Sequence, residues 1–366
     1  MELHLPDNYR RYVEKVSNGR NTVLYDSSGR PSIMVVIPKF QLEHIDPALG
    51  TGVHPAFLVN GREIDYFMVA KYKAGPFAGG VVSLPGMDPY HTVALEEASA
   101  LSSQKGHGWH LMTNAEWAAL ALMAWHGGQL PRGNTVGGRA HDEPNEEGEI
   151  TPDDTTEYGV STPRTLTGTG PDSWNHDGTP FGVADVVGNV WEWTSGLRLF
   201  EGELQIIANN DAAVVGAMAA EEASAWRAIL ADGSLVDPET DDTLKFDVVT
   251  PGDTGDLGAL KISTDLTNFN QRKSGEDAMG AGPYQGFSSD IPGLNDQMLK
   301  ALTILPPAST GLGDGVGLWA RPFGERALLR SGDYYHAHSC GIFCFNLNYA
   351  PENLGPHIGF RFAYIP

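Results

Sequence analysis

The stretch Leu328–Phe362 reads LLRSGDYYHAHSCGIFCFNLNYAPENLGPHIGFRF. Its two ends, LLRSG and IGFRF, combine apolar residues with Gly and Arg and are typical of a structural framework. Between them, residues 333–357 are crowded with Tyr, His, Cys, Phe and Asn and follow neither a helical nor a strand period. Tyr and His offer an apolar face with a polar group, and Asn offers adaptable hydrogen bonds. The stretch therefore predicts an irregular binding surface displayed on a scaffold.

The composition is that of a folded globular protein. The chain has 366 residues, of which 41% are hydrophobic and 19% charged, and its 44 glycines and 24 prolines indicate many turns between short strands. The net charge of −22 opposes binding to nucleic-acid phosphates. No apolar run reaches membrane-spanning length, and the polar N-terminus lacks the pattern of a signal peptide. Two cysteines do not make a disulfide framework.

The first half of the chain predicts a mixed α+β domain. Residues 1–30 are expected to form an N-terminal arm with a short helix. The run SIMVVIPKF, residues 32–40, is typical of a buried strand, and Asn60-Gly61 predicts a hairpin. Asp88-Pro89 predicts the start of a helix that runs to about Gln104. A second helix is expected after the capping box that Thr113 forms with Glu116.

Residues 197–311 are interpreted as a long insertion. Amphipathic spacing predicts a helix over residues 215–230, and the runs LKFDVV and GALKIS, residues 244–249 and 258–263, predict a further hairpin. The insertion could form an independent subdomain, an oligomer contact or a support under the tail. The sequence leaves these three alternatives open.

Two internal motifs and the tail carry a resemblance to known families. GWHLMTNAEWAAL, residues 108–120, and GVADVVGNVWEW, residues 182–193, resemble the formylglycine-generating, sulfatase-modifying superfamily. Residues 328–361 are similar to the variable region of the variable proteins of diversity-generating retroelements, which share this subtype of the C-type-lectin fold. The resemblance implies an α+β C-type-lectin fold over residues 31–366, with short antiparallel sheets, two helices, the 197–311 insertion and a variable region at 328–362.

In such variable proteins, adenines in the DNA of the variable region are replaced by other bases. A randomised Asn codon can then encode only a restricted set of amino acids. Residues 331–357 contain no Lys, Gln, Met or Trp, which agrees with that restriction. The ligand-binding positions implied by the resemblance are Asp333, Tyr334, Tyr335, His336, His338, Cys340, Tyr349, Leu354, Gly355, Pro356 and His357.

The resemblance also implies a function in recognition without chemistry. The expected protein is a receptor-binding component of a phage or prophage tail, or a displayed bacterial protein. Its partner would be a protein or glycan on a target cell surface, with no role for nucleic acid or membrane insertion. The expected location is the virion surface, or the cytoplasm before assembly. An oligomer is compatible with this reading, and no cofactor is required.

The motif GVADVVGNVWEW also resembles a calcium site of the enzyme superfamily. The implied ligands are the side chains of Asp185 and Glu192 and the carbonyl oxygens of Gly188 and Val190. Oxygen ligands suit Ca²⁺ because it is a hard cation. The alternative is that Glu192 stabilises a turn without a metal ion.

Two other functions remain open at the level of sequence. A copper-dependent formylglycine-generating oxidase would use Cys340 and Cys344, because paired thiolates bind Cu(I), but no Arg surrounds the pair as it does in those enzymes. A calcium-dependent sugar-binding lectin would need a short Glu-Pro-Asn motif, and Pro351-Glu352-Asn353 has the wrong order. The tail could also be an irregular loop without a binding role.

Overall fold

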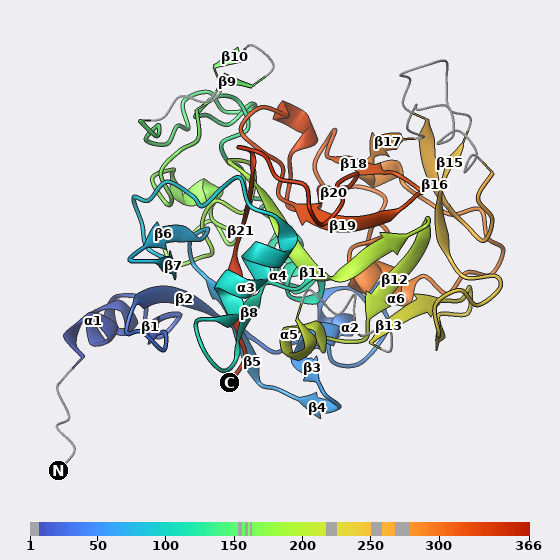
Figure 1. Cartoon of the computed structure of the whole chain (residues 1–366), viewed down its shortest axis with the longest axis horizontal. Coiled ribbons are helices and arrows are strands. Elements are labelled where there is room, and N and C mark those ends of the chain that lie inside the picture. Colours follow the sequence, from blue (N-terminus) through green and yellow to red (C-terminus); the bar gives the residue numbers. More distant parts are fainter. Residues whose placement is uncertain are drawn as a thin grey trace.

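The computed structural model describes residues 7–152, 156, 157, 160, 161, 163–216, 225–249, 258–267 and 279–366. Two main sheets and a buried helix make up the fold, with the N-terminal hairpin at one end and the strands of the insertion at the other (Figure 1). One large hydrophobic core runs through both sheets. The predicted α+β class is confirmed, although the described residues form six α-helices, not the two expected, and two of the strand pairs are parallel.

The smaller sheet has five strands in the order β1-β2-β5-β22-β8 among the described residues. The β-branched run of β2 lies inside it, with β1 and β5 pairing antiparallel on its two sides. The C-terminal strand β22 pairs antiparallel with both β5 and β8, which fixes the end of the chain in the interior of this sheet. Its strands are β1 (Asn21–Tyr25), β2 (Pro31–Pro38), β5 (Tyr66–Ala70), β8 (Trp109–Leu111) and β22 (Phe362–Tyr364).

The larger sheet has eleven strands in the described part of the chain, and the long strand β11 lies at its centre. β11 pairs antiparallel with β12 and β19 and parallel with β21. Its strands are β11 (Trp191–Phe200), β12 (Glu203–Ile207), β13 (Trp226–Ile229), β14 (Leu235–Val236), β15 (Lys245–Val249), β16 (Ala259–Ser263), β17 (Gly280–Pro283), β18 (Gly317–Ala320), β19 (Glu325–Arg330), β20 (Phe345–Leu347) and β21 (Ile358–Phe360).

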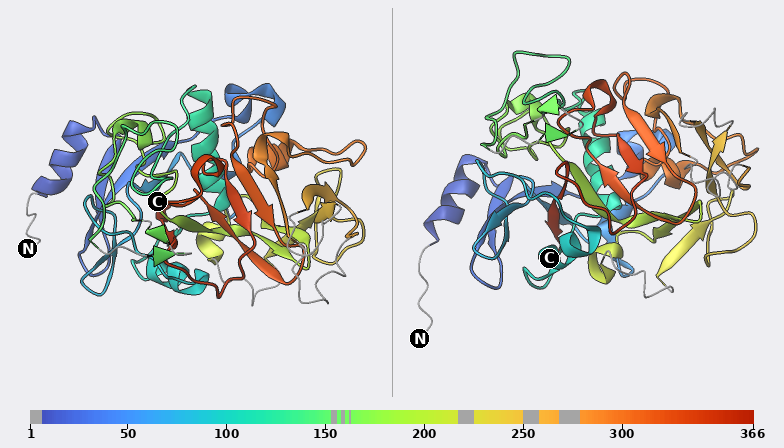
Figure 2. Two further views of the ribbon diagram at one scale, coloured as in Figure 1. Left: turned by 90° about the horizontal axis from the view of Figure 1, so that it is seen from above. Right: turned by 45° about the horizontal axis from the view of Figure 1, so that its top comes forward.

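Helix α4 (Asn114–His126) is the central helix, and it stands between the strands of the N-terminal half and those of the insertion in both views of Figure 2. The predicted capping box starts it: the Thr113 hydroxyl accepts from the Glu116 N–H, and the Glu116 carboxylate accepts from the Thr113 N–H. Ten of its residues are buried, because Ala and Leu cover the helix on every side. No described helix is both long and apolar enough to cross a bilayer.

The remaining elements are short. The Asn60-Gly61 hairpin is confirmed, with both residues at positive φ as a tight turn of this kind requires. The other helices are α1 (Asn8–Val16), α2 (Leu42–Ile45), α3 (Leu95–Ser103), α5 (Ala212–Val215) and α6 (Gln297–Ala301). The small hairpins pair β3 (Leu58–Val59) with β4 (Arg62–Glu63), β6 (Gly75–Phe77) with β7 (Gly80–Val82), and β9 (Thr156–Glu157) with β10 (Val160–Ser161).

The predicted helix start at Asp88 is wrong, because α3 begins at Leu95. The Asp88 carboxylate is bound by the Arg164 guanidinium, at 2.9 and 2.8 Å, and caps no helix. The residues that follow Asp88 bond to other segments: the Tyr90 N–H donates to Ala74, and the Thr92 N–H donates to Gly355. These contacts hold the chain outside a helix until Leu95.

Two predictions about the chain's organisation also need correction. Trp226–Ile229, expected at the end of a helix, is strand β13 because it pairs with β12, while residues 217–224 of that helix lie outside the described residues. The boundary at residue 30 falls in the turn between β1 and β2, so the second half of the predicted arm belongs to the smaller sheet. The insertion likewise adds its strands to the larger sheet, and the hairpin of β15 with β16 is confirmed.

Candidate functional site

The tail segment, defined here as residues 331–357, lies between two strands, β19 and β21, that both pair with β11. β19 precedes it and places Arg330 opposite Glu192 on β11. β21 follows it and places Ile358 opposite Trp191 on the other side of β11. Both ends of the segment are therefore fixed beside the start of β11. Between them the chain is irregular except for the short strand β20, which pairs with β18 and β19, so the prediction of a wholly irregular segment is corrected there.

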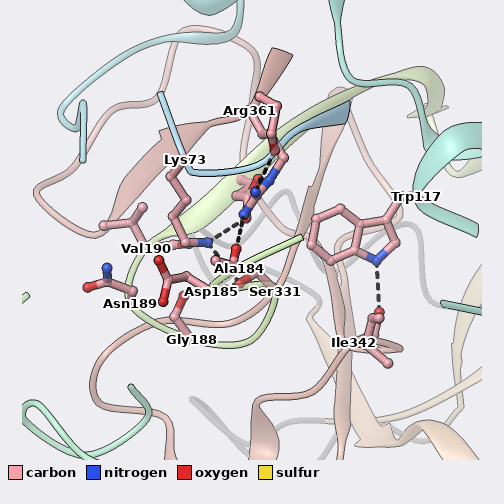
Figure 3. Close-up of polar contacts among 12 residues, drawn as sticks. Lys73, Trp117, Ala184, Asp185, Gly188, Asn189, Val190, Ser331, Ile342 and Arg361 are labelled. Atoms are coloured by element: carbon pink, nitrogen blue, oxygen red, sulfur yellow. Dashed lines mark hydrogen bonds and ion pairs between the residues drawn. The ribbon is translucent and has the colours of Figure 1, made fainter. Parts of the chain in front are cut away.

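Buried side chains beneath the tail segment hold its frame. Arg330 donates to the Asn114 amide oxygen at 2.6 Å and to the Thr303 hydroxyl at 3.1 Å. Burial lowers the pKa of Arg330 to about 10, which leaves it charged at neutral pH. Trp117 on α4 donates through Nε1 to the Ile342 carbonyl at 2.8 Å (Figure 3). The central helix thus supports the segment at both of these points.

Asp333 is fully buried and organises the first part of the tail segment. Its carboxylate accepts from Trp191 Nε1 at 3.1 Å and from the backbone N–H groups of Tyr335 and His336 at 3.0 and 3.1 Å. It also contacts His336 Nδ1 at 2.7 Å. Tyr334 is buried beside it. The structure therefore assigns Asp333 and Tyr334 to support, and the prediction that they contact a ligand directly is corrected.

Tyr335, His336 and His338 do reach the surface, as predicted. Tyr335 is 40% exposed, His338 is exposed and His336 is half-buried. The Tyr335 and His336 rings lie 4.3 Å apart between centroids. The centroid of the His336 ring also lies about 6 Å from those of the Trp191 and Trp319 rings. The two indole rings pack edge to face against each other. We call Trp191, Trp319, Tyr335 and His336 the aromatic cluster.

Trp319 was not among the predicted site residues. It lies on β18, outside the tail segment, and only its contacts with His336 and Trp191 bring it to the site. It is half-buried, so part of its ring remains accessible. The sequence signal for it was weak, because a lone Trp on a strand is more often a core residue than a contact residue.

The second part of the tail segment divides in the same way. Leu354 is 57% exposed, and Tyr349 and Pro356 are half-buried. His357 is buried and contacts the Tyr349 hydroxyl through Nε2 at 3.2 Å. Gly355 is buried, and its carbonyl accepts from Thr92 and Ile358. The prediction of direct ligand contact is therefore corrected for Gly355 and His357.

The two cysteines are buried free thiols. Cys340 Sγ donates to the Asp333 carbonyl at 3.3 Å. Burial raises the pKa of both Cys340 and Cys344 above the ordinary value for a thiol. Both groups therefore stay protonated at neutral pH, whereas a copper site needs thiolates. Cys340 is corrected from a displayed residue to a packing residue.

A side-chain ammonium lies among the implied calcium ligands: Figure 3 shows Lys73 beside Val190 and Asp185. Lys73 Nζ donates to the Val190 carbonyl at 3.1 Å, to Ser331 Oγ at 3.2 Å and to a carboxylate oxygen of Glu192. Ser331 Oγ in turn donates to the Gly188 carbonyl at 3.1 Å. Lys73 and Glu192 are both buried.

Arg361 binds the same carboxylate from the other side. Its Nε donates to Glu192 at 2.9 Å, and its other nitrogens donate to backbone carbonyls that include Ala184. Burial favours a higher pKa for Glu192, but the charges of Arg361 and Lys73 outweigh burial and leave that pKa below its ordinary value. Asp185 accepts from the Gly168 N–H at 2.7 Å, and burial raises its pKa.

A comparison with models of protein families identifies the family of the chain. The Sulfatase-modifying factor enzyme 1-like domain matches residues 31–220, which is more than half of the 366-residue chain. The chain belongs to this family. Its mixed fold is accordingly the predicted C-type-lectin-like fold. The family includes enzymes, so membership alone leaves open what this member does.

Among solved structures, Treponema denticola variable protein 1 aligns with a TM-score of 0.33 and 12% identity, over 94% of this chain and 99% of that chain. No curated protein matches the sequence.

The residues present do not fit a calcium ion at the implied site. Calcium takes six to eight oxygen ligands at about 2.3–2.6 Å. Here the Glu192 carboxylate and the Val190 carbonyl already accept from Lys73, and the carboxylate also accepts from Arg361. In the part of the chain that the structure describes, no group of three His, Cys, Asp or Glu side chains could hold a metal ion.

Proposed function

We propose that this protein binds a ligand through the exposed side chains of its tail segment, without catalysing a reaction. The observation that carries the proposal is the aromatic cluster. The exposed ring of Tyr335 and the half-buried rings of His336 and Trp319 are held in place by a buried carboxylate, Asp333, and by the buried ring of Trp191. Aromatic side chains that are fixed before binding give contact area at low entropic cost.

The finer proposal is a variable protein of a diversity-generating retroelement, displayed on a phage or prophage tail or on a bacterial surface. The separation of exposed from buried side chains in and beside the tail segment supports this finer proposal. Tyr335, His338 and Leu354 are exposed, while Asp333 and the framework Arg330 are buried. Exposed positions tolerate substitution at about ±0.5 kcal/mol, so side chains there can change without loss of the fold.

The partner we propose is a protein or glycan on a target cell surface. The net charge of −22 repels nucleic acid, and aromatic rings with polar groups suit both proteins and sugars. Copper chemistry is not favoured, because the two thiols that would carry it are buried and protonated at neutral pH.

The binding test uses two exposed residues and a matched control. The double variant Tyr335→Ala with His338→Ala is compared with Tyr12→Ala, which removes a ring that is 65% exposed on α1. The probes are a glycan array and an array of bacterial surface proteins. A central Tyr contributes about 2 kcal/mol or more to binding, so the double variant should lose a signal that Tyr12→Ala keeps. Unchanged binding by the double variant would contradict the proposal.

The diversification is tested in the DNA beside the gene. We expect a second, nearly identical copy of the stretch that encodes residues 333–357, differing at adenines, together with a reverse-transcriptase gene. The differences should fall at the codons for exposed residues such as Tyr335, His338 and Leu354. They should avoid the Asp333 codon, because other side chains there would leave buried donors unpaired. A single copy with no such repeat would exclude this mode of diversification.

A further inference from the structure

A cavity opens directly beside the tail segment. Its volume is about 360 Å³, within the size range of small-ligand pockets. Its wall is formed by Val187 and by three stretches far apart in sequence: residues 130–142, residues 312–316 and residues 338–342. His338, a predicted binding residue, lies on its rim. None of the functions considered so far uses this cavity.

The cavity is built rigidly against the tail segment. The Ala337 N–H donates to the Thr135 carbonyl at 3.0 Å, and the Gly137 N–H donates to the Tyr334 carbonyl at 2.8 Å. The close approach of Gly341 to Val316 leaves no room for a larger residue, since a Cβ at Gly341 would lie 2.5 Å from Val316. A pocket fixed in this way loses little entropy when a ligand enters.

The charges that face the cavity do not cancel. Arg132, the one arginine among the described residues of the wall, is neutralised by the Glu146 carboxylate, which accepts from its Nε at 2.9 Å. Asp142 and Asp314 are exposed, and neither forms an ion pair with a described residue. Partial burial lowers the pKa of His141, although the neighbouring Asp142 carboxylate acts to raise it. Two exposed carboxylates that form no ion pair with a described residue therefore face a space that also has apolar walls.

The apolar walls complete the chemistry of the pocket. They are formed by Leu130, Pro131, Val187, Leu312, Val316 and Ile342. An aliphatic chain packs on such a surface while a charged end group stays with the polar groups at the rim.

We propose that this cavity binds a lysine or arginine side chain of the partner protein. The aliphatic stem of that side chain would lie on the apolar wall, and its cationic end would pair with Asp142 and Asp314. The pocket adjoins the exposed residues of the tail segment, so the same partner protein could contact both. The proposal therefore rests on the proposed function, which supplies that partner.

The test measures binding of short blocked peptides to the full chain by NMR titration. Acetyl-Gly-Arg-Gly-amide and acetyl-Gly-Lys-Gly-amide are compared with the norleucine and glutamate peptides of the same form. We expect the two cationic peptides to shift resonances of residues 312–316 and 338–342, and the glutamate peptide to leave them unchanged. Norleucine binding as strong as lysine binding would contradict the proposal, because the carboxylates would then contribute nothing.

Charge variants provide the matched control. Asp142→Asn combined with Asp314→Asn should weaken the cationic peptides about tenfold, whereas Asp290→Asn, an exposed carboxylate outside the cavity, should not. If the double variant binds the cationic peptides as tightly as the parent protein does, the proposed pocket is refuted. The Tyr335→Ala and His338→Ala array experiment is separate. If peptides bind as expected while the arrays show no dependence on Tyr335, the proposed function fails and the pocket stands.

A second inference comes independently from the buried ions under the tail segment. We infer that the Lys73 ammonium permanently takes the place of the metal ion that the family motif implies. It lies among the acceptors that calcium would use, the Val190 carbonyl and the Glu192 carboxylate, and Ser331 relays its contact to the Gly188 carbonyl. With Arg361 on the same carboxylate, a divalent ion would add positive charge to a site that already holds two cations.

Calcium and a chelator test this inference. The melting temperature of the unaltered protein should be the same in millimolar calcium and in EDTA. A crystal grown with calcium should show the Lys73 side chain, and no ion, between Val190 and Glu192. In Lys73→Ala the Val190 carbonyl loses its donor and Glu192 keeps only Arg361, so this variant should be destabilised and should regain melting temperature on addition of calcium. An ion at this position in the unaltered protein would overturn the inference. So would a Lys73→Ala variant that is as stable as the parent in EDTA.

Discussion

Asp333 shapes the exposed surface although no part of it is accessible. Its carboxylate joins three kinds of partner: the indole of Trp191, the backbone N–H groups of Tyr335 and His336, and the His336 ring. The two backbone contacts turn the chain sharply, and the ring contact fixes the orientation of His336 within the aromatic cluster. The exposed side chains therefore depend on a residue that is itself buried.

Replacing Asp333 with Ala should reduce both stability and order in the tail segment. Hydrogen bonds to a charged group contribute about 1.5–3 kcal/mol each, with some of that loss recovered by relaxation, so we expect about 3 kcal/mol less free energy of unfolding. Urea unfolding measures this. Glu352→Ala, at an exposed carboxylate of the same segment, should change stability by less than about 0.5 kcal/mol. Similar losses in the two variants would show that Asp333 has no organising role.

At the scale of elements, α4 links local sequence to the site. The capping box starts the helix at Asn114, the side chain of Asn114 accepts from Arg330, and Trp117 one turn later binds the Ile342 carbonyl. A helix start that shifted by one residue would rotate both side chains away from the tail segment by about 100°. The capping box thus sets the register of the supports as well as the beginning of the helix.

Thr113→Ala should lower the free energy of unfolding by about 1–2 kcal/mol, the usual cost of losing an N-cap side chain. The Thr113 hydroxyl also donates to Asn210 at 2.6 Å, so the upper end of that range is expected. Thermal and urea unfolding give the value. Gln104→Ala at the exposed end of α3, where only backbone groups form the cap, serves as the control and should be close to neutral. A Thr113 variant as stable as that control would refute the role of the cap.

At the scale of the whole molecule, buried ionisable groups link the fold to pH. His54 accepts from the Ala56 N–H through Nδ1 at 3.1 Å and contacts the Ala301 carbonyl through Nε2 at 2.9 Å. His176 accepts from the Val183 N–H at 2.8 Å. Burial lowers the pKa of each to about 4. Both rings are therefore neutral in the folded protein, and their charged forms are favoured only after unfolding.

The sign of the resulting pH dependence follows from these lowered values. Between about pH 6.5 and pH 4 the unfolded chain binds more protons than the folded one, so stability falls as the pH drops through this window. Each histidine accounts for at most about 3 kcal/mol, from the difference between its folded and unfolded pKa. His110 acts in the opposite direction: despite burial, the Glu116 carboxylate keeps its pKa raised, and that contribution is lost at higher pH.

Urea unfolding between about pH 7 and pH 4.5 measures how steeply the free energy of unfolding changes with pH. His54→Gln should flatten this dependence, since glutamine does not titrate there, while His107→Gln at an exposed position should leave it unchanged. Equal slopes in the parent and the His54 variant would contradict the assignment of a neutral buried imidazole.

Local patterns were sufficient to predict several elements. The β-branched run of β2, the Asn60-Gly61 hairpin and the Thr113–Glu116 capping box each depend on residues a few positions apart, and all three are present. The family motifs likewise fixed the mixed fold and the framework on either side of the tail segment. The helix predicted from Asp88 failed because its cap residue is bound by Arg164, 76 positions away.

The sequence by itself determined that a tail crowded with contact residues is held between two framework strands. Only the tertiary structure decided which of those residues are accessible. Asp333 became a support because Trp191, 142 positions away, donates to it. Two of the implied calcium ligands, Val190 and Glu192, became acceptors for Lys73, which lies 119 positions before Glu192, although a lysine in the apolar run MVAKYKA was itself a sign of a buried ion pair. Burial and charge pairing are set by partners distant in sequence, and these partners meet only when the sheets close around the core.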